Sequence, residues 1–364
     1  MKSDNIRTVI TGTGSYIPER LVTNADFLGS EFFDPLGAPL AHGIENTIEK
    51  FEAITGIGAR RYVRDDLKTS DIAFYAARDA IATSGTDKEE LDYIIVAHNF
   101  GDVDAVGRRS DFVPTLAARV KHLLEIRNPR TIAYDLPFGC AGWLQAVIQA
   151  DWFVRSGDVR RVLVIGAETL SRICDPHDRD SMIYADGAGA CVLEGVQSET
   201  PVGIMAHSSR SDTYKHAHLL RMDRSYNPDF AGSDLFLKMQ GHKLYEYALR
   251  HVPPVVKECI TRAGLSLGDI SKVLIHQANA KMDDAILKRV YKLFGTDPAP
   301  ALVMPMTISW LGNSSVATLP TLLDLLLKEK LENQRLAPGQ RIVLASVGAG
   351  MNISAAVYGL PGTS

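Results

Sequence analysis

Cys140 has the strongest local signal for chemistry in this chain of 364 residues. It lies in the stretch LPFGCAGW, a glycine-flanked turn that follows an apolar strand and precedes the amphipathic run WLQAVIQADWFV. We therefore expect the thiol at a helix N-terminus, where the helix dipole and free amides favour thiolate over thiol. Small neighbours (Gly139, Ala141 and Gly142) would let a bulky substrate approach the sulfur. These features fit a nucleophile, although a lone cysteine in an apolar setting is more often a small core residue.

Two more polar residues occupy similar junctions. His276 ends the apolar strand VLIHQ, and Asn313 lies in SWLGNSSVATLPTLL, a glycine-flanked turn before a helix. Taken alone, the histidine fits a satisfied core or turn residue, and the asparagine fits a helix cap. The glycine strings DGAGACVLE and SVGAGMNIS lack a P-loop lysine, and a strand follows each of them. We therefore reject phosphate binding for both strings and expect close backbone approach, with N–H groups that could face an oxyanion.

The elements that position these residues come in two similar sets. Residues 77–99 and 256–279 each run from an amphipathic helix through a glycine and an acidic turn to a short apolar strand. A second pair, SGDVRRVLVIGAETL and APGQRIVLASVGAGM, repeats a polar turn that leads into a β-branched strand. We predict two α/β halves of like topology, residues 1–198 with the cysteine and residues 199–364 with the histidine and asparagine. Continuous apolar strands predict sheets covered by helices on both faces.

Composition excludes several classes of protein. The chain is 46% hydrophobic and 23% charged, and its formal net charge of −4 argues against binding to nucleic acid or an anionic membrane surface. No apolar run approaches the roughly 18 residues of a membrane span, and the N-terminus has no signal-peptide pattern. The four cysteines have neither metal-ligand spacing nor a dense disulfide pattern. We expect a cytoplasmic protein with reduced thiols and no metal.

Taken together, these motifs resemble thiolase-superfamily condensing enzymes, most closely the β-ketoacyl-acyl-carrier-protein synthase III family. ITGTGSYIPERLVTNADF resembles the start of the family, and CDPHDR and YADGAGACVLE resemble its middle. HQAN, GNSSVATLP and SVGAGMNISAAVYG resemble its second half, so the resemblance covers nearly the whole chain. It implies the thiolase fold, in which two duplicated α/β halves form a five-layered αβαβα sandwich. It also implies a homodimer that uses thioester substrates without a cofactor.

The resemblance assigns a role to each junction residue. Cys140 would take an acyl group from a thioester. His276 and Asn313 would hydrogen-bond the thioester carbonyl of a malonyl-type extender and stabilise the enolate that forms as CO2 leaves. The amides of Cys140 and Gly350 would form the oxyanion hole. A carboxylate is lost here without a metal, so hydrogen-bond donors must meet the charge as it develops.

The expected entrance departs from the family pattern. Typical members hold the coenzyme A nucleotide with a tryptophan and an arginine before a TGI motif, and those positions are Lys50 and Ile54 here. Arg179 of CDPHDR remains. An acyl donor carried on acyl carrier protein is therefore our hypothesis, and a coenzyme A thioester is the alternative. The extra stretch SEFFDPLGAPLAHGIENTIEK lies near the expected entrance, where it either rebuilds that entrance or forms a surface elaboration.

Two further surfaces follow from the resemblance. The long loop NFGDVDAVGRRSDFVPTLAARV lies where family members send a residue across the dimer to close the partner's acyl pocket. Val113 aligns with a position often held by an aromatic residue, which predicts a deeper pocket, although Phe112 beside it could fill that space. On the helix after the histidine, Lys281, Lys288 and Arg289 match the basic positions that dock the carrier protein, and the alternative is a solvated helix face. Asp283 and Asp284 interrupt this patch.

Three functions follow as hypotheses. The first is a decarboxylative Claisen condensation of an acyl primer with a malonyl or β-ketoacyl thioester, in fatty-acid initiation or in a specialised polyketide or alkyl-aromatic pathway. The second is transfer of the cysteine-bound acyl group to an oxygen or nitrogen acceptor. The third is a catalytically silent partner of an active ketosynthase, a role in which a catalytic residue is usually lost. A thiolase proper needs a second cysteine near the C-terminus, and none follows Cys259.

Overall fold

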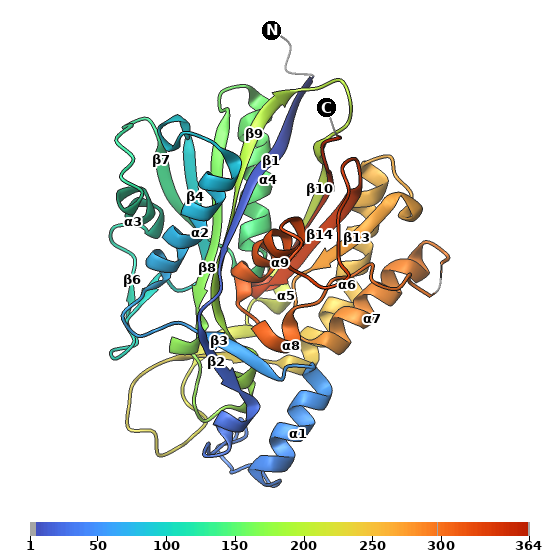
Figure 1. Ribbon diagram of the computed structural model, residues 1–364. Helices are drawn as coiled ribbons and strands as arrows, with labels where there is room; N and C mark the ends of the chain where they lie inside the picture. The colour runs from blue at the N-terminus through green and yellow to red at the C-terminus, as the bar shows by residue number, and fades with distance from the viewer. Residues whose placement is uncertain (1–4, 297, 363–364) are drawn as a thin grey trace.

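Two large β-sheets and three layers of helices form the main body of the fold, which the computed structural model describes for residues 5–296 and 298–362 (Figure 1). The first sheet has the strand order β1-β9-β8-β4-β7 and the second has the order β10-β15-β14-β13. The strands of the first sheet are β1 (Ile6–Tyr16), β9 (Asp186–Gln197), β8 (Arg161–Thr169), β4 (Tyr93–His98) and β7 (Ile132–Pro137). Those of the second are β10 (Gly203–Ser211), β15 (Asn352–Gly359), β14 (Arg341–Gly348) and β13 (Ile270–Ile275).

The two sheets repeat one pairing pattern. In each, the first two neighbouring pairs are antiparallel and the third is parallel, and the first sheet adds β7 in parallel beside β4. At the matching edge of the second sheet, the amide of Val273 donates to the carbonyl of Val303 at 2.9 Å. The second half thus repeats the topology of the first. Strand β9 ends at Gln197 and β10 begins at Gly203, and a domain division between residues 198 and 199 stays a prediction.

The layers follow from alternation along the strands. On β4, Ile94 and Val96 pack against α2 (Thr69–Ser84) and α3 (Leu116–Leu123). Ile95 and Ala97 face the other way, against α4 (Gly142–Ser156) and α9 (Thr318–Leu327), which also contact the second sheet. Both faces of the sheet are therefore buried, and this explains the continuous apolar strands.

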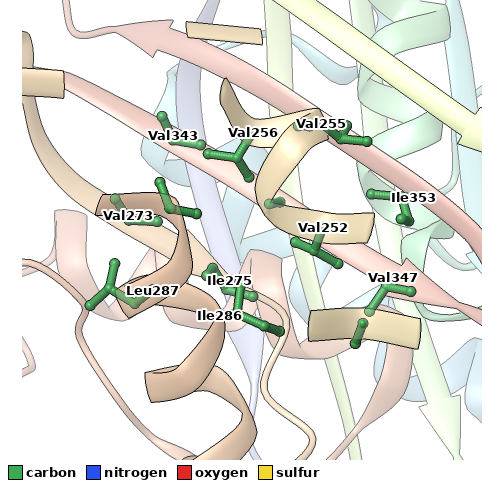
Figure 2. Packing of buried hydrophobic residues seen from close by; sticks show 14 of the residues in the cluster. Val252, Val255, Val256, Val273, Ile275, Ile286, Leu287, Val343, Val347 and Ile353 are labelled. Carbon is green, nitrogen blue, oxygen red and sulfur yellow. The ribbon is translucent and has the colours of Figure 1, made fainter. Parts of the chain in front are cut away.

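Helices α6 (Gly241–Arg262) and α7 (Ala280–Leu293) form the outermost layer on the second sheet. Figure 2 shows Val252 and Val256 of α6, Ile286 of α7, and Val273 and Val343 of the sheet within one buried cluster. The order of layers is α2 and α3, first sheet, α4 and α9, second sheet, α6 and α7 (Figure 1). The predicted five-layered αβαβα fold is confirmed.

The remaining strands are short. They form the paired strands β2 (Arg20–Thr23) with β3 (Ala59–Tyr62), β5 (Asp102–Val103) with β6 (Ser110–Asp111), and β11 (Leu220–Asp223) with β12 (Phe236–Met239). The helices among them are α1 (Ile44–Thr55), α5 (Thr213–His216) and α8 (Ile308–Leu311). Within the described ranges, no helix is long and apolar enough to cross a membrane.

Candidate active site

Cys140 lies in a tight turn where β7 gives way to α4. A 3₁₀ turn spans Gly139–Ala141, and α4 begins at Gly142, so the predicted junction is confirmed. Gly139 has a φ of 65°, and a Cβ there would lie 2.6 Å from the amide nitrogen of Ala349. A Cβ on Gly348 would lie 2.4 Å from the amide nitrogen of Cys140. These glycines let the two loops pack backbone against backbone, which is the close approach that the glycine string predicts.

The protonation state of Cys140 differs from our expectation. Burial raises the pKa of its thiol to about 11, while a hydrogen bond from the hydroxyl of Ser315, 3.2 Å from the sulfur, lowers the pKa. The expectation that the helix N-terminus favours thiolate was wrong. At a typical exposed site, a helix dipole stabilises a charged group by about 0.3–1 kcal/mol, which corresponds to less than one pKa unit. Removal of a thiolate from water costs more than that. The group is a neutral thiol at pH 7.

His276 directly follows β13 and is 3% exposed. Burial lowers its pKa to about 4, so the imidazole is neutral at pH 7. Its amide donates to the carbonyl of Ala345 at 2.8 Å, which fixes the backbone at this point. Its Nδ1 atom has no hydrogen-bond partner among the residues that the structure describes. A neutral imidazole can donate one hydrogen bond from a single ring nitrogen without carrying charge.

Asn313 follows α8 and is 5% exposed. Its backbone amide donates to the carbonyl of Ile183 at 2.9 Å, and its carbonyl accepts from the amide of Ala185 at 2.8 Å. Its Oδ1 accepts from the amide of Ser315 at 2.8 Å. Because the side-chain oxygen is engaged in this way, the Nδ2 group is left to donate into the site.

The three side chains line one cavity of about 430 Å³, and Gly350 lines it with them. The sequence-predicted Cys140, His276 and Asn313 are thus brought together from two halves of the chain. Most of the remaining wall is apolar and includes Phe100, Phe138, Leu170, Met239 and Leu244. Such a wall suits an acyl chain beside the sulfur.

A second cavity of about 830 Å³ adjoins the first. The two share wall residues, among them Met239, Ala278, Met282 and Asn313. Lys50, Ile54 and Arg179 line the second cavity, so the predicted entrance residues lie together. The inserted stretch contributes to the same wall through Phe33, Asp34, Pro35, Leu40, Ala41 and His42. This stretch therefore lines the second cavity together with Lys50, Ile54 and Arg179.

The other predicted binding residues lie on the surface of the chain. Phe112 is 45% exposed and Val113 is 85% exposed, and neither lines the two cavities of its own chain. Lys281, Lys288 and Arg289 all belong to α7 and are exposed.

Two of these α7 residues have partners on the protein. Lys288 pairs with Asp284 at 2.6 Å, and the guanidinium of Arg289 donates to the carbonyl of Leu249 at 3.1 Å. Asp283 does not interrupt the surface patch, as we had expected, because its side chain is fully buried on the inner face of α7. Only Asp284 contributes a negative charge to the patch from this pair.

Sequence reasoning missed three polar residues beside the cysteine. Ser315 contacts the sulfur directly, and Asn99 and Glu168 are hydrogen-bonded behind it. Ser315 stands within the quoted motif GNSSVATLP, so it had a sequence signal, whereas the other two had none. The four cysteines are free, and no cluster in the described part of the chain has three His, Cys, Asp or Glu residues that could hold a metal ion.

Two protein-family models match the chain. The model for 3-oxoacyl-(acyl-carrier-protein) synthase III matches residues 134–213, which include Cys140. The model for its C-terminal part matches residues 260–360, which include His276 and Asn313.

Individual proteins match over nearly the whole chain. A β-ketoacyl-(acyl-carrier-protein) synthase III of Rhodospirillum rubrum is 35% identical over 358 residues, which cover 97% of this chain and 99% of the relative. The crystal structure of the synthase III from Thermus thermophilus is similar with a TM-score of 0.78 and 31% identity, over 98% of this chain and 100% of that one. The priming β-ketosynthase of the R1128 polyketide biosynthetic pathway has a TM-score of 0.78 and 26% identity, over 98% of this chain and 97% of that one.

Proposed function

The chain belongs to the 3-oxoacyl-(acyl-carrier-protein) synthase III family, and on that premise we propose that it is a ketosynthase that joins a cysteine-bound acyl primer to a malonyl-type thioester. In reaction class it is an acyltransferase that forms a carbon–carbon bond by decarboxylative Claisen condensation. The observation that carries the proposal is the convergence of Cys140, His276 and Asn313 on one apolar cavity.

The first half-reaction is acylation of Cys140. Its sulfur attacks the carbonyl of the donor thioester, the tetrahedral oxyanion lies against the amides of Cys140 and Gly350, and the carrier thiol leaves with the proton. Gly350 has a φ of 76°, a conformation that presents its amide at low cost only because it is glycine. Since the resting thiol is protonated, its proton must leave as the sulfur attacks.

The second half-reaction is condensation. The neutral imidazole of His276 and the Nδ2 group of Asn313 donate to the thioester carbonyl of the extender. Loss of CO2 puts negative charge on that oxygen. The enolate carbon then attacks the acyl carbonyl, and the sulfur of Cys140 leaves as a thiolate. Each donor that meets a developing oxyanion is worth about 2.7–4 kcal/mol.

We propose a carrier-protein-bound donor in preference to coenzyme A. Typical members hold the nucleotide with a tryptophan and an arginine, and Lys50 and Ile54 occupy those two positions here. Both residues line the second cavity beside Arg179. The side chain of Arg179 is 61% exposed and comes no closer than 4.0 Å to a carboxylate, that of Asp180. Lys281, Lys288 and Arg289 on α7 provide a basic face for an acidic carrier, which would mainly accelerate the encounter.

The inserted stretch at the entrance supports a specialised pathway. It contributes an apolar wall to the larger cavity, and this favours a bulky extender or primer over acetyl and malonyl groups alone. The similarity to a priming ketosynthase of a polyketide pathway agrees with that assignment, although initiation of fatty-acid synthesis uses the same chemistry.

We also propose a homodimer that forms along β7. This strand is the edge of the first sheet, and its first residue, Ile132, is 48% exposed. The exposed Phe112 and Val113 would then reach the partner's acyl cavity rather than their own. Sedimentation of the purified protein tests the dimer, and a monomer at micromolar concentration contradicts it.

Intact-mass measurement tests the function. The protein is incubated with a panel of acyl-carrier-protein and acyl-coenzyme A thioesters, with Cys140→Ala as the control. We expect a mass gain equal to one acyl group that the control lacks, larger with carrier-bound donors. Addition of malonyl-carrier protein should then release a β-ketoacyl product and CO2. Acylation without any condensation product would favour transfer to another acceptor, and no acylation from any donor would overturn the proposal.

A further inference from the structure

A buried carboxylate lies behind the nucleophile. Glu168, near the end of β8, is 1% exposed. Its Oε2 accepts two hydrogen bonds from one residue, Asn99, at 3.0 Å from the backbone amide and 2.6 Å from Nδ2. Nothing in the two half-reactions above uses either residue.

The hydrogen bonds continue from Asn99 to the sulfur. The Nδ2 group of Asn99 also donates to the hydroxyl oxygen of Ser315 at 3.0 Å, and that hydroxyl donates to the sulfur of Cys140 at 3.2 Å. Ser315 has a φ of 53°, which is uncommon for a residue other than glycine. Its amide is held by the side-chain oxygen of Asn313, so this conformation is tied to the second half of the site.

The direction of this chain depends on its buried end. An ionised carboxylate can only accept hydrogen bonds, so it forces Asn99 to present its NH2 group rather than its oxygen. The second hydrogen of that NH2 group occupies a lone pair of Ser315, whose own hydrogen is then left for the sulfur. If Asn99 turned over, its oxygen would accept the Ser315 hydrogen, and Cys140 would lose its donor.

We propose that Glu168 is a positioning residue that acts through Asn99 to hold the Ser315 hydroxyl as a hydrogen-bond donor to Cys140. This inference rests on the proposed function, because a donor to the sulfur matters when that sulfur must become a thiolate and later leave as one. Glu168 does not itself line the cavity, whereas Asn99 and Ser315 do.

Two effects of Glu168 on the thiol oppose each other, and this makes the proposal testable. Its negative charge raises the pKa of Cys140 through space, while the hydroxyl that it positions lowers that pKa. Glu168→Gln removes the charge and keeps an acceptor for Asn99. Glu168→Leu removes the charge and the acceptor. The two variants have side chains of similar size, so their difference isolates the hydrogen-bond chain.

The experiment follows alkylation of Cys140 by iodoacetamide against pH, read at the Cys140 peptide by mass spectrometry. Burial raises the pKa of Glu168 to about 7, so data above pH 8 compare the ionised carboxylate with its replacements. The other charged or titratable groups that act on it, His98 of β4 and Asp186 of β9, are kept in all variants. A hydrogen bond to a charged group is worth about 1.5–3 kcal/mol, so the Leu variant should have at least roughly tenfold less thiolate than the Gln variant at equal pH.

Variants of Ser315 test whether the effect of Glu168 on Cys140 passes through the Ser315 hydroxyl. Ser315→Ala alone should also lower the thiolate fraction at least about tenfold, and in that background the Gln and Leu variants should no longer differ. Equal behaviour of the two variants in the wild-type background would overturn the proposal, as would a difference that persists without Ser315. If Glu168→Leu does not fold, as thermal unfolding would show, Asn99→Ala interrupts the same chain and must reproduce the effect of Ser315→Ala.

This readout uses no acyl donor. A protein that no thioester acylates, but whose alkylation follows the expected order, would disprove the proposed function and leave the positioning role intact. If the protein condenses thioesters normally and its Gln and Leu variants are alkylated at the same rate, the proposed function is supported and the positioning role of Glu168 is disproved.

Discussion

Replacement of Asn313 by alanine should separate the two half-reactions. Its Oδ1 is engaged by the amide of Ser315 at 2.8 Å, so the donor left for substrate is its Nδ2 group. In the proposed mechanism, that group donates to the extender carbonyl, whereas backbone amides donate to the acyl carbonyl on Cys140. We therefore expect Asn313→Ala to slow condensation strongly and to leave acylation within a few-fold of the wild-type rate.

Asn313→Ala should affect both the rate of condensation and the stability of the protein. Loss of one donor to a developing oxyanion costs about 2.7–4 kcal/mol, which corresponds to roughly 100- to 1,000-fold in the rate of condensation. The same change leaves the amide of Ser315 without its partner in a region where Asn313 itself is only 5% exposed. An unpaired buried amide costs about 1–3 kcal/mol of stability. The variant should therefore melt several degrees below the wild type and still be folded at 25 °C.

The assay measures each half-reaction on the same sample. Acylation is followed by intact mass with a carrier-bound primer, and condensation by β-ketoacyl product after malonyl-carrier protein is added to the preformed acyl-enzyme. The acylation rate is the internal control for folding. An equal loss in both half-reactions would refute the reasoning, because Asn313 would then act on the nucleophile rather than on the extender. Unchanged condensation would refute it as well.

Four other predictions follow from particular contacts. Gly348→Ala would place a Cβ 2.4 Å from the amide nitrogen of Cys140, so intact-mass measurement should show no acylation. In the control Gly268→Ala, the nearest atom to the new Cβ would lie at 3.7 Å, so acylation should be normal. The rate of Cys140 alkylation by iodoacetamide should rise about tenfold per pH unit up to pH 10, because burial raises the pKa of the thiol to about 11 and the thiolate fraction grows until that pH is passed. A plateau in the rate below pH 9 would contradict this expectation. Lys281→Glu should lower kcat/KM several-fold for carrier-bound donors and not for coenzyme A donors, and the difference should shrink at 0.5 M salt. Lys238→Met would leave two buried aspartates without their cation, which lies 2.5 and 3.0 Å from them, and thermal unfolding should show a loss of about 3–5 kcal/mol.

The sequence indicated the fold because its signals were repeated. Two helix-to-strand units in the same order predicted two like halves, and continuous apolar strands predicted sheets covered on both faces. The structure has both features, and the alternation of Ile94 with Ile95 between two clusters shows why the strands have no polar face. Cys140, His276 and Asn313 line one cavity, as the family resemblance implied, whereas the local pattern around each of them also fitted a core, turn or capping role.

Other features were beyond a local pattern. Asn99 contacts Glu168 across 69 positions and Ser315 across 216, and no spacing in the sequence relates residues so far apart. The raised pKa of Cys140 depends on how much water reaches the sulfur, which only packing determines. Asp283 is a different case. It stands three and four residues before Ile286 and Leu287 on the buried face of α7, so helical spacing already indicated that it was not a surface charge.

In the proposed condensation, the charge states of His276 and Asn313 favour the transition state of decarboxylation over the bound substrate. An extender carries a carboxylate, and a cationic imidazole would stabilise that carboxylate before the reaction as well as the enolate afterwards. Burial instead lowers the pKa of His276 to about 4, and Asn313 is uncharged, so neither donor offers the carboxylate a full positive charge. Their hydrogen bonds gain strength only as negative charge moves onto the thioester oxygen. In an apolar cavity, neutral donors thus provide differential binding, which is the part of binding that accelerates a reaction.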